Sequence, residues 1–272
     1  MAHFIKSHGL GNDYLVIDPR DLPVELTPEA TRRICDRNRG VGSDGILLVA
    51  PSTAADFGVR ILNPDGSEAE KSGNGVRIFA KFLRDHGYSD RDRFVIETPG
   101  GLVAVELHRR DGRVAEVLAE MGRARFDDLD AIDVDGGRLD VTSVSVGNPH
   151  CVVVVPDLGA VDVRGLGPKI ESHPAFPNRT NVQFVQVVTR SEVRAEIWER
   201  GAGYTLASGS SACAVAAACH RLGLVDREVA VTMPGGQLQI AIGEDGMLRM
   251  LGPVEEVCSG DLSEELLASL RG

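Results

Sequence analysis

Short apolar runs separated by glycine- and proline-containing turns make up most of the chain. Some runs are too short for helices and are bounded by turn residues, so they predict buried strands: Tyr14–Ile17, Ile46–Val49, Cys151–Val155 and Val182–Val185. Others alternate or are rich in β-branched residues, and they predict half-buried strands: Leu102–Leu107, Val114–Met121, Val229–Met233 and Gln237–Ile242. Asp111-Gly112 and Asp245-Gly246 have the composition of hairpin turns.

Few segments have a helical pattern. Thr27-Pro28 fits an N-cap followed by proline at the first helical position, and it leads into Glu29–Arg37. Asn74–His86 carries an apolar stripe, whereas Ser210–Leu222 is rich in alanine and cysteine on nearly every side, which indicates burial at the centre of a domain. Leu262–Leu270 predicts a short final helix.

The chain resembles itself at an offset of 136 residues. The matches follow one another in order: Gly11-Asn12 with Gly147-Asn148, Ile46–Val49 with Val182–Val185, Ile61–Asn63 with Ile197–Glu199, and Ser72-Gly73 with Ser208-Gly209. Pro99-Gly100-Gly101 and Pro234-Gly235-Gly236 match one residue out of register. We therefore expect an α+β fold of two pseudo-symmetric domains, each a mainly antiparallel sheet wrapped around a central helix. The expected domains are 1–117 and 118–260, followed by a tail, 261–272.

Charge and composition exclude several classes of protein. The 272 residues include 29 Lys and Arg against 40 Asp and Glu, a net charge of −11, which argues against a nucleic-acid binder or a basic membrane-surface protein. No apolar run approaches the roughly 20 residues that span a bilayer, and the N-terminus lacks an apolar leader, so we expect a cytoplasmic protein. The five cysteines lack the spacing of a disulfide framework and should be reduced, and no metal-binding motif is present.

Two glycine-containing turns directly precede the repeat-related helices. They are Ser72-Gly73-Asn74-Gly75 and Ser208-Gly209-Ser210-Ser211. A helix start offers N–H groups and the positive end of the helix dipole, which together suit an anion such as a carboxylate. We expect the two starts to hold one anion between the domains. The alternative is that both serines are ordinary N-caps.

Other polar residues occupy related places in the two halves. Each one alone is explained by a turn, or for the histidine by a place in the core. Together they form a set of amides with one arginine and one glutamate, which suits a zwitterionic ligand in the cleft between the domains. The set is Asn12, Asn63, Asn148, His150, Asn181, Glu199 and Arg200.

The whole chain resembles the diaminopimelate epimerase family. The resemblance is carried by HGLGNDY (8–14), NPDGSEAEKSGNGVR (63–77), VGNPHCVVVV (146–155), ESHPAFPNRTNVQFV (171–185), ERGAGYTLASGSSACA (199–214) and MPGG (233–236). It implies two epimerase-like domains with the active site between them, often in a homodimer. It also implies interconversion of LL- and meso-2,6-diaminopimelate without a cofactor, in lysine and peptidoglycan-precursor synthesis. In the family, a cysteine of each domain acts in turn as base and acid at the α-carbon.

The resemblance also implies roles for individual residues. Asn12, Asn63, Asn148, Asn181 and Arg200 would hold the distal, non-reacting end of the substrate. Gly73-Asn74 and Gly209-Ser210 would hold the reacting carboxylate through backbone N–H groups. His150 and Glu199 would flank the reacting amine and help to set the ionisation of the two bases, which correspond to Ser72 and Ser208.

The sequence departs from the family pattern at these bases, because the family's two cysteines fall at Ser72 and Ser208. Tyr14, Tyr204 and Ser211 also stand where the family usually has phenylalanine, glutamate and glycine. The favoured interpretation is a diaminopimelate epimerase slowed by its serine bases. The alternatives are a pair of engineered cysteine replacements, another amino-acid racemase, a hydroxyproline epimerase or dehydratase, an allylic isomerase on the same scaffold, and a non-catalytic amino-acid-binding paralogue.

Overall fold

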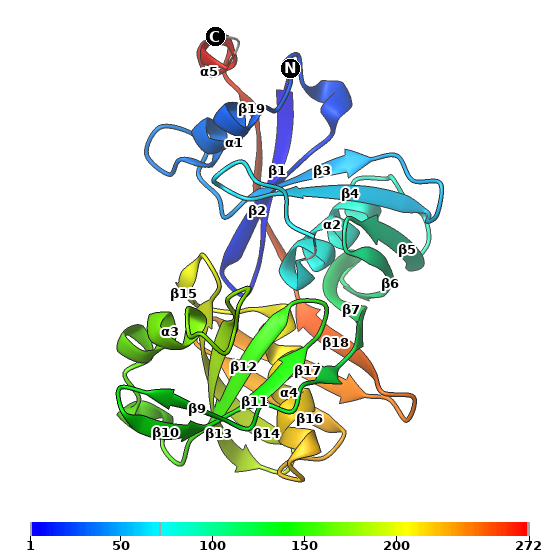
Figure 1. Ribbon diagram of the computed structural model, residues 1–272. Coiled ribbons are helices and arrows are strands. Elements are labelled where there is room, and N and C mark those ends of the chain that lie inside the picture. The colour runs from blue at the N-terminus through cyan, green and yellow to red at the C-terminus, as the bar shows by residue number, and fades with distance from the viewer. Residues whose placement is uncertain (1, 71, 271–272) are drawn as a thin grey trace. The chain divides into compact units, whose positions relative to one another are not determined.

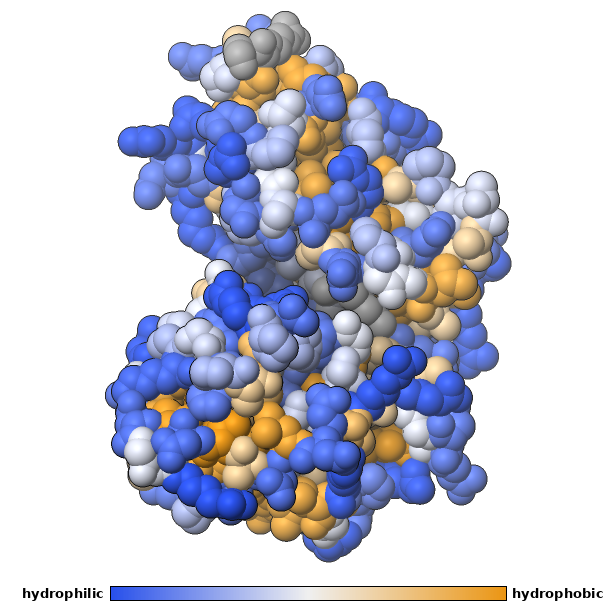
Figure 2. All heavy atoms as spheres, viewed as in Figure 1, coloured by the Kyte–Doolittle hydropathy of each residue, from blue (hydrophilic) through white to orange (hydrophobic). Residues whose placement is uncertain are grey.

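A computed structural model describes residues 2–70 and 72–270 of the chain and divides it into two units (Figure 1). Unit 1 comprises residues 1–119 together with 252–272, and unit 2 comprises residues 120–251. Hydrophilic residues cover much of the face shown in Figure 2, with patches of hydrophobic residues between them. No helix in the described ranges is long and apolar enough to cross a membrane.

The sheet of unit 1 is built around strands β1 and β2, which form a hairpin. Its strands are β1 (Ala2–Gly9), β2 (Asn12–Ile17), β3 (Ile46–Ala50), β4 (Phe57–Leu62), β5 (Arg93–Thr98), β6 (Gly101–Arg110), β7 (Arg113–Arg123) and β19 (Glu255–Leu262). The pairs β2–β3 and β4–β5 are parallel, and the pairs β19–β1, β1–β2, β3–β4, β5–β6 and β6–β7 are antiparallel.

The sheet of unit 2 follows the same scheme. Its strands are β8 (Arg125–Phe126), β11 (Thr142–Ser145), β12 (Pro149–Val154), β13 (Asn181–Thr189), β14 (Glu192–Glu199), β15 (Gly203–Thr205), β16 (Glu228–Met233), β17 (Gly236–Ile242) and β18 (Met247–Pro253). The pairs β12–β13 and β14–β16 are parallel, and the pairs β8–β11, β11–β12, β13–β14, β14–β15, β16–β17 and β17–β18 are antiparallel. Strands β9 (Ala131–Val134) and β10 (Gly137–Asp140) form a separate two-stranded sheet.

The sequence repeat is thus a repeat of topology. From β1 to β7 and from β11 to β18, the order of parallel and antiparallel pairs is the same once the short strand β15 is set aside. The α+β class with mostly antiparallel pairing and few helices is confirmed.

Each sheet packs against one long helix that begins at a serine. Helix α2 (Gly73–Asp85) contacts β1, β2 and β6, and helix α4 (Gly209–Arg221) contacts β11, β12, β13, β14, β16 and β17. All residues of α4 from Ser211 to Cys219 are buried, as its composition predicted. A helix buried on every side must be apolar or small on every side, which explains the run of alanines.

The other helices belong to smaller layers of the two units. Helix α1 (Pro28–Cys35) begins at the predicted cap, Thr27, whose side chain accepts a hydrogen bond from the N–H of Ala30. Helix α3 (Val163–Glu171) holds the same place in the repeat but was not predicted, because Gly165, Gly167 and Pro168 are poor helix formers. Gly167 is required by packing, since a Cβ there would lie 2.6 Å from Cγ of Trp198. Single-turn 3-10 helices span Pro19–Asp21 and Leu158–Ala160.

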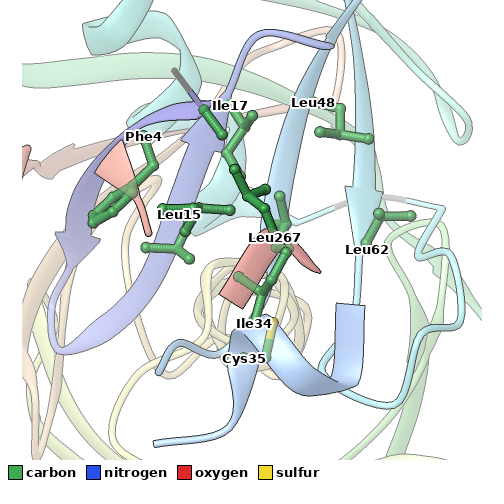
Figure 3. Close-up of a cluster of buried hydrophobic side chains, with 11 residues drawn as sticks. Phe4, Leu15, Ile17, Ile34, Cys35, Leu48, Leu62 and Leu267 are labelled. Carbon is green, nitrogen blue, oxygen red and sulfur yellow. The ribbon is translucent and has the colours of Figure 1, made fainter. Parts of the chain in front are cut away.

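The C-terminal segment returns to unit 1, which differs from the predicted boundary. Residues 252–260 were predicted to belong to the second domain and 261–272 to a separate tail, but β19 pairs with β1 along its whole length. Helix α5 (Glu264–Ser269) follows, capped by Ser263. In the core cluster of Figure 3, Leu267 of α5 lies among Leu15, Ile17 and Ile34. Backbone pairing and apolar burial together hold this segment in unit 1.

Candidate active site

Ser72 is the N-cap of α2 and the start of the first half-site, which we define as Tyr14, Asn12 and the turn 72–75. Its extended backbone (φ −134°, ψ 118°) turns the side chain back over the helix, so that Oγ accepts a hydrogen bond from the N–H of Gly75 at 3.0 Å. The phenol oxygen of Tyr14 lies 3.2 Å from the same Oγ. The hydroxyl predicted to act as a base is therefore an N-cap that has a second polar partner.

The amide side chains of the first half-site form a chain of hydrogen bonds. Asn74 Nδ2 donates to Asn12 Oδ1 at 3.0 Å, and Asn12 Nδ2 donates to Asp44 Oδ2 at 2.9 Å. Arg77, fully buried one turn into α2, donates from Nη2 to Asn74 Oδ1 at 2.9 Å and from Nη1 to the Gly73 carbonyl at 3.3 Å. The structure thus brings together Asn12, Gly73 and Asn74 as the sequence predicted, through an arginine that the sequence did not single out.

Asn63 lies in a turn of its own. Its backbone N–H donates to the Ser67 carbonyl at 2.8 Å, its carbonyl accepts from Gly66, and its side chain donates to Ser67 Oγ at 3.0 Å. No printed contact joins Asn63 to the other residues of the first half-site within the described part of unit 1. The contacts of Asn63 are those of the turn explanation that the sequence left open.

Ser208 begins the second half-site, which we define as Asn148, His150 and the turn 208–211. It repeats the geometry of Ser72: the backbone is extended (φ −144°, ψ 125°), and Oγ accepts from the N–H of Ser211 at 3.5 Å. The Oγ of Ser210 lies 3.5 Å from the Oγ of Ser208. Both helices therefore start in the same way, with a serine at the position predicted for a base.

His150 is fully buried and both of its ring nitrogens are bonded within unit 2. Gln183 Nε2 lies 3.0 Å from His150 Nδ1 and also donates to Ser211 Oγ at 3.0 Å, and His150 Nε2 lies 2.9 Å from Asn148 Oδ1. Since an amide nitrogen can only donate, Nδ1 is the acceptor and Nε2 carries the hydrogen. Burial lowers the pKa of His150 to about 3, against the hydrogen bond from Gln183, so the ring is neutral. His150 thus links the Asn148 turn to the start of α4.

We expect this buried histidine to make the protein less stable in mild acid. The unfolded chain protonates histidine near pH 6.5, whereas the folded chain holds His150 neutral down to about pH 3, so stability falls as the pH falls between these values. Between pH 7.5 and pH 5 the loss should be about 2 kcal/mol. Urea unfolding of the wild type and His150→Gln should give a flatter pH dependence for the variant. Equal slopes would contradict a neutral His150, and the difference at pH 7.5 measures the lost packing and hydrogen bonds alone.

Asn181 connects the start of β13 to the end of β14. Its Nδ2 donates to the Pro149 carbonyl at 2.8 Å, and its Oδ1 accepts from the backbone N–H of Arg200 at 3.0 Å. The Arg200 guanidinium donates to the Asn178 carbonyl at 3.2 Å. Asn181, Arg200 and the Asn148-Pro149-His150 turn are therefore joined, and Glu199 is adjacent in the chain to Arg200.

Tyr204, where the family usually has glutamate, is engaged on β15. Its hydroxyl donates to Glu196 Oε2 at 2.5 Å, and the guanidinium carbon of Arg164 lies 4.3 Å from its ring centroid. The hydrogen bond to Glu196, together with burial, raises the pKa of Tyr204 to about 12. Tyr204 therefore remains a neutral donor at ordinary pH.

The cysteines stand at neither helix cap. Cys35, Cys151, Cys213 and Cys219 are buried and Cys258 is exposed on β19. Burial raises the pKa of Cys151 and of Cys219 to about 12, which disfavours the reactive thiolate. Within the described residues, no group of three or more His, Cys, Asp or Glu side chains is placed to hold a metal ion.

The comparisons with known proteins agree with this geometry. The diaminopimelate epimerase family matches residues 4–126 and 142–257. The chain is 49% identical to diaminopimelate epimerase 2 of Nostoc sp., over 97% of each chain, and 43% identical to the diaminopimelate epimerase of Pelotomaculum thermopropionicum, over 95% of this chain and 98% of the relative. The chain belongs to the diaminopimelate epimerase family. As a member of this family it is an isomerase.

Solved structures with lower identity share the fold of this epimerase family member. A hydroxyproline epimerase from Agrobacterium vitis aligns with a TM-score of 0.76 at 18% identity, covering 96% of this chain and 90% of its own. A phenazine biosynthesis protein of the PhzF family from Bacillus anthracis aligns with a TM-score of 0.75 at 16% identity, covering 96% and 99%. The fold is therefore shared by proteins with different names.

Three buried polar residues of this family member were missed by sequence reasoning: Arg77, Gln183 and, less deeply placed, Asp44. Arg77 and Gln183 interrupt apolar runs, in α2 between Val76 and Ile78 and in β13 between Val182 and Phe184. A fully buried polar side chain needs internal partners, so such an interruption is the signal that would have found them.

Proposed function

We propose that the protein interconverts LL- and meso-2,6-diaminopimelate by removing and returning the α-proton. The relatives at 41–49% identity named diaminopimelate epimerase support this substrate. The observation that carries the proposal is the repeated serine-capped helix start, which carries a polar network of its own in each unit.

In this proposal the two half-sites act on one substrate. Ser72 and Ser208 remove the proton from one face of the α-carbon and return one to the other face. Backbone N–H groups of Gly73-Asn74 and Gly209-Ser210 hold the carboxylate, where negative charge grows as the proton leaves. Asn12, Asn63, Asn148, Asn181 and Arg200 bind the distal end, and Glu199 binds the reacting amine. His150, which is fully buried, keeps the Asn148 turn and α4 in place.

The proposed enzyme is slow because a serine hydroxyl is a poor acid and base. A thiol titrates near pH 8.5, and a hydroxyl that behaves like water titrates near 15.7, a gap of about 7 pKa units. This is on the order of 10 kcal/mol for complete ionisation, whereas a helix dipole contributes at most about 2 kcal/mol. The difference remains even if only part of it is felt in the transition state.

The test is incubation of the purified chain with LL-diaminopimelate in D₂O. The proposal predicts that meso-diaminopimelate appears and that its new centre carries deuterium, because the returned hydrogen comes from a group in exchange with solvent. The products are separated by chiral chromatography and the deuterium is counted by mass spectrometry. No exchange at high enzyme concentration would reject the proposal, and exchange of hydroxyproline or another amino acid in place of diaminopimelate would reject the substrate. The homodimer and the cytoplasmic location stay predictions.

A further inference from the structure

We propose that Tyr14 is the proton relay of Ser72: as a phenolate it accepts the hydroxyl hydrogen of Ser72 while Ser72 accepts the α-proton of the substrate. This inference rests on the proposed function and names the group that makes a serine base workable in the first half-site. The hydroxyl of Tyr14 is one that the family's usual phenylalanine lacks.

The geometry places the two hydroxyls in contact. Tyr14 Oη and Ser72 Oγ are 3.2 Å apart, within reach of a hydrogen bond in which either oxygen is the donor. Ser72 Oγ also accepts from the N–H of Gly75 at 3.0 Å, which keeps the serine oxygen in place. A hydroxyl has one hydrogen and two acceptor positions, so Ser72 can accept from Gly75 and still donate to Tyr14.

The Tyr14 ring is held rigidly where this contact is made. Tyr14 lies on β2 between β1 and β3, and only 6% of its surface is exposed. A Cβ added to Gly45 would lie 2.7 Å from Tyr14 Cε1, so the ring packs directly on the Gly45 backbone. A ring confined in this way keeps its hydroxyl at the serine without a further entropic cost.

The repeat puts a polar ring at the corresponding place in each unit. Tyr14 and His150 are 136 residues apart, as are Ser72 and Ser208. In unit 2 the ring reaches the helix start through Gln183 and Ser211, whose counterparts in unit 1 are Leu47 and Gly75. Since neither Leu47 nor Gly75 has a polar side chain, Tyr14 makes its contact with the serine directly.

The relay balances as two coupled proton transfers. The α-C–H bond breaks and its electron pair stays on the substrate, delocalised into the carboxylate. The α-proton forms a new O–H bond with Ser72, and the original hydrogen of Ser72 forms the O–H bond of neutral Tyr14. An ordinary phenol titrates near pH 10, about 6 pKa units below a water-like hydroxyl, so the phenolate is far easier to form than a serine alkoxide.

Other charged groups surround Tyr14 and must be separated from it in any pH profile. Lys6 and Asp44 are held with Asp13 and Arg37 in a network of ion pairs and hydrogen bonds. His8 of β1 lies 3.7 Å from Glu255, and Arg77 of α2 donates to Asn74. All of these groups remain in Tyr14→Phe, so the difference between the two profiles belongs to the tyrosine hydroxyl.

The experiment measures α-proton exchange of the full chain against pH, for wild type, Tyr14→Phe and the matched control Tyr88→Phe. Tyr88 donates to Asp18 and has no place in either half-site. The wild-type rate should rise about tenfold per pH unit between pH 7 and 9. Tyr14→Phe should lose roughly 100-fold in kcat at pH 9 and lose this rise, with KM changed less than twofold. Tyr88→Phe should match the wild type.

A second comparison separates the relay from a merely structural role. In the Ser72→Cys background, Tyr14→Phe should cost less than threefold, because a thiol ionises without a relay. An equal loss in both backgrounds, or a wild-type pH profile in Tyr14→Phe, would overturn the relay while leaving the proposed function intact. A wild-type chain that exchanges no α-proton of diaminopimelate would overturn both.

Discussion

Replacing both Ser72 and Ser208 with cysteine should raise the rate of diaminopimelate epimerisation by roughly 1000-fold or more. A thiol ionises about 7 pKa units more readily than a water-like hydroxyl, and a transition state that feels less than half of this gap still gains three orders of magnitude. The helix starts that hold these positions are already formed, since each residue is an N-cap with the same extended backbone. The measurement is the initial rate of LL-to-meso conversion at saturating substrate.

The single variants and a distant control show whether the gain comes from the bases. Ser208→Cys should gain more than Ser72→Cys alone, because Tyr14 already assists Ser72 in the wild type. Ser89→Cys adds a thiol at another buried serine of unit 1 and should leave the rate unchanged. An unchanged rate in the double variant would favour a different substrate or a protein that only binds its ligand.

Replacing Arg77 with leucine should destabilise the chain by about 3 kcal/mol or more. The guanidinium is fully buried and donates to Asn74 Oδ1, the Gly73 carbonyl and the Pro253 carbonyl, the last at 3.4 Å. Each buried acceptor left without a donor costs about 1–3 kcal/mol. Urea unfolding followed by circular dichroism measures the loss, and the same change should weaken ligand binding because Asn74 loses its support.

Two variants on the same helix test this explanation. Arg77→Lys keeps the charge but lacks the guanidinium fork, so it should lose part of the stability. Arg84→Leu removes a more exposed arginine whose ion pair with Asp92 spans 2.9 Å, and it should cost less than about 1 kcal/mol. If Arg77→Leu costs no more than Arg84→Leu, the buried arginine does not hold the start of α2 and the C-terminal return together.

Much of the fold could be predicted because the sequence repeats. The apolar runs that match at an offset of 136 became β2, β3, β12 and β13, and the two serine turns became helix caps. Helix α3 could not be predicted from its own composition, since Gly165, Gly167 and Pro168 disfavour a helix and tertiary packing overrides that preference. Its position 136 residues after α1 was the available signal.

The C-terminal boundary could not be predicted for a different reason. The pairing of β19 with β1 joins residues more than 240 positions apart, from Ala2 with Leu262 to His8 with Glu255. Local periodicity indicates that a strand is present but does not name its partner in a sheet. The segment was therefore assigned to the unit that precedes it in sequence.

The candidate site was predictable where side chains follow the repeat. Asn12 and Asn74, Asn148 and His150, and Asn181 and Arg200 are in hydrogen-bonding contact, as their common motifs suggested. The partners of His150 and Ser72 were not predicted, because a hydrogen bond such as that of Gln183 depends on which way a buried side chain points. The contact between Tyr14 and Ser72 likewise joins residues 58 positions apart.

The central claim is that the two serine hydroxyls serve opposite faces of one α-carbon. The direct measurement is deuterium exchange into LL- and into meso-diaminopimelate by Ser72→Ala and by Ser208→Ala, at enzyme concentrations where the wild type exchanges both. A variant with one hydroxyl left can still remove and return a proton on its own face. Each variant should therefore exchange one epimer without inverting it, and the two variants should favour opposite epimers. Exchange of the same epimer by both variants, or of both epimers by either one, would contradict the claim.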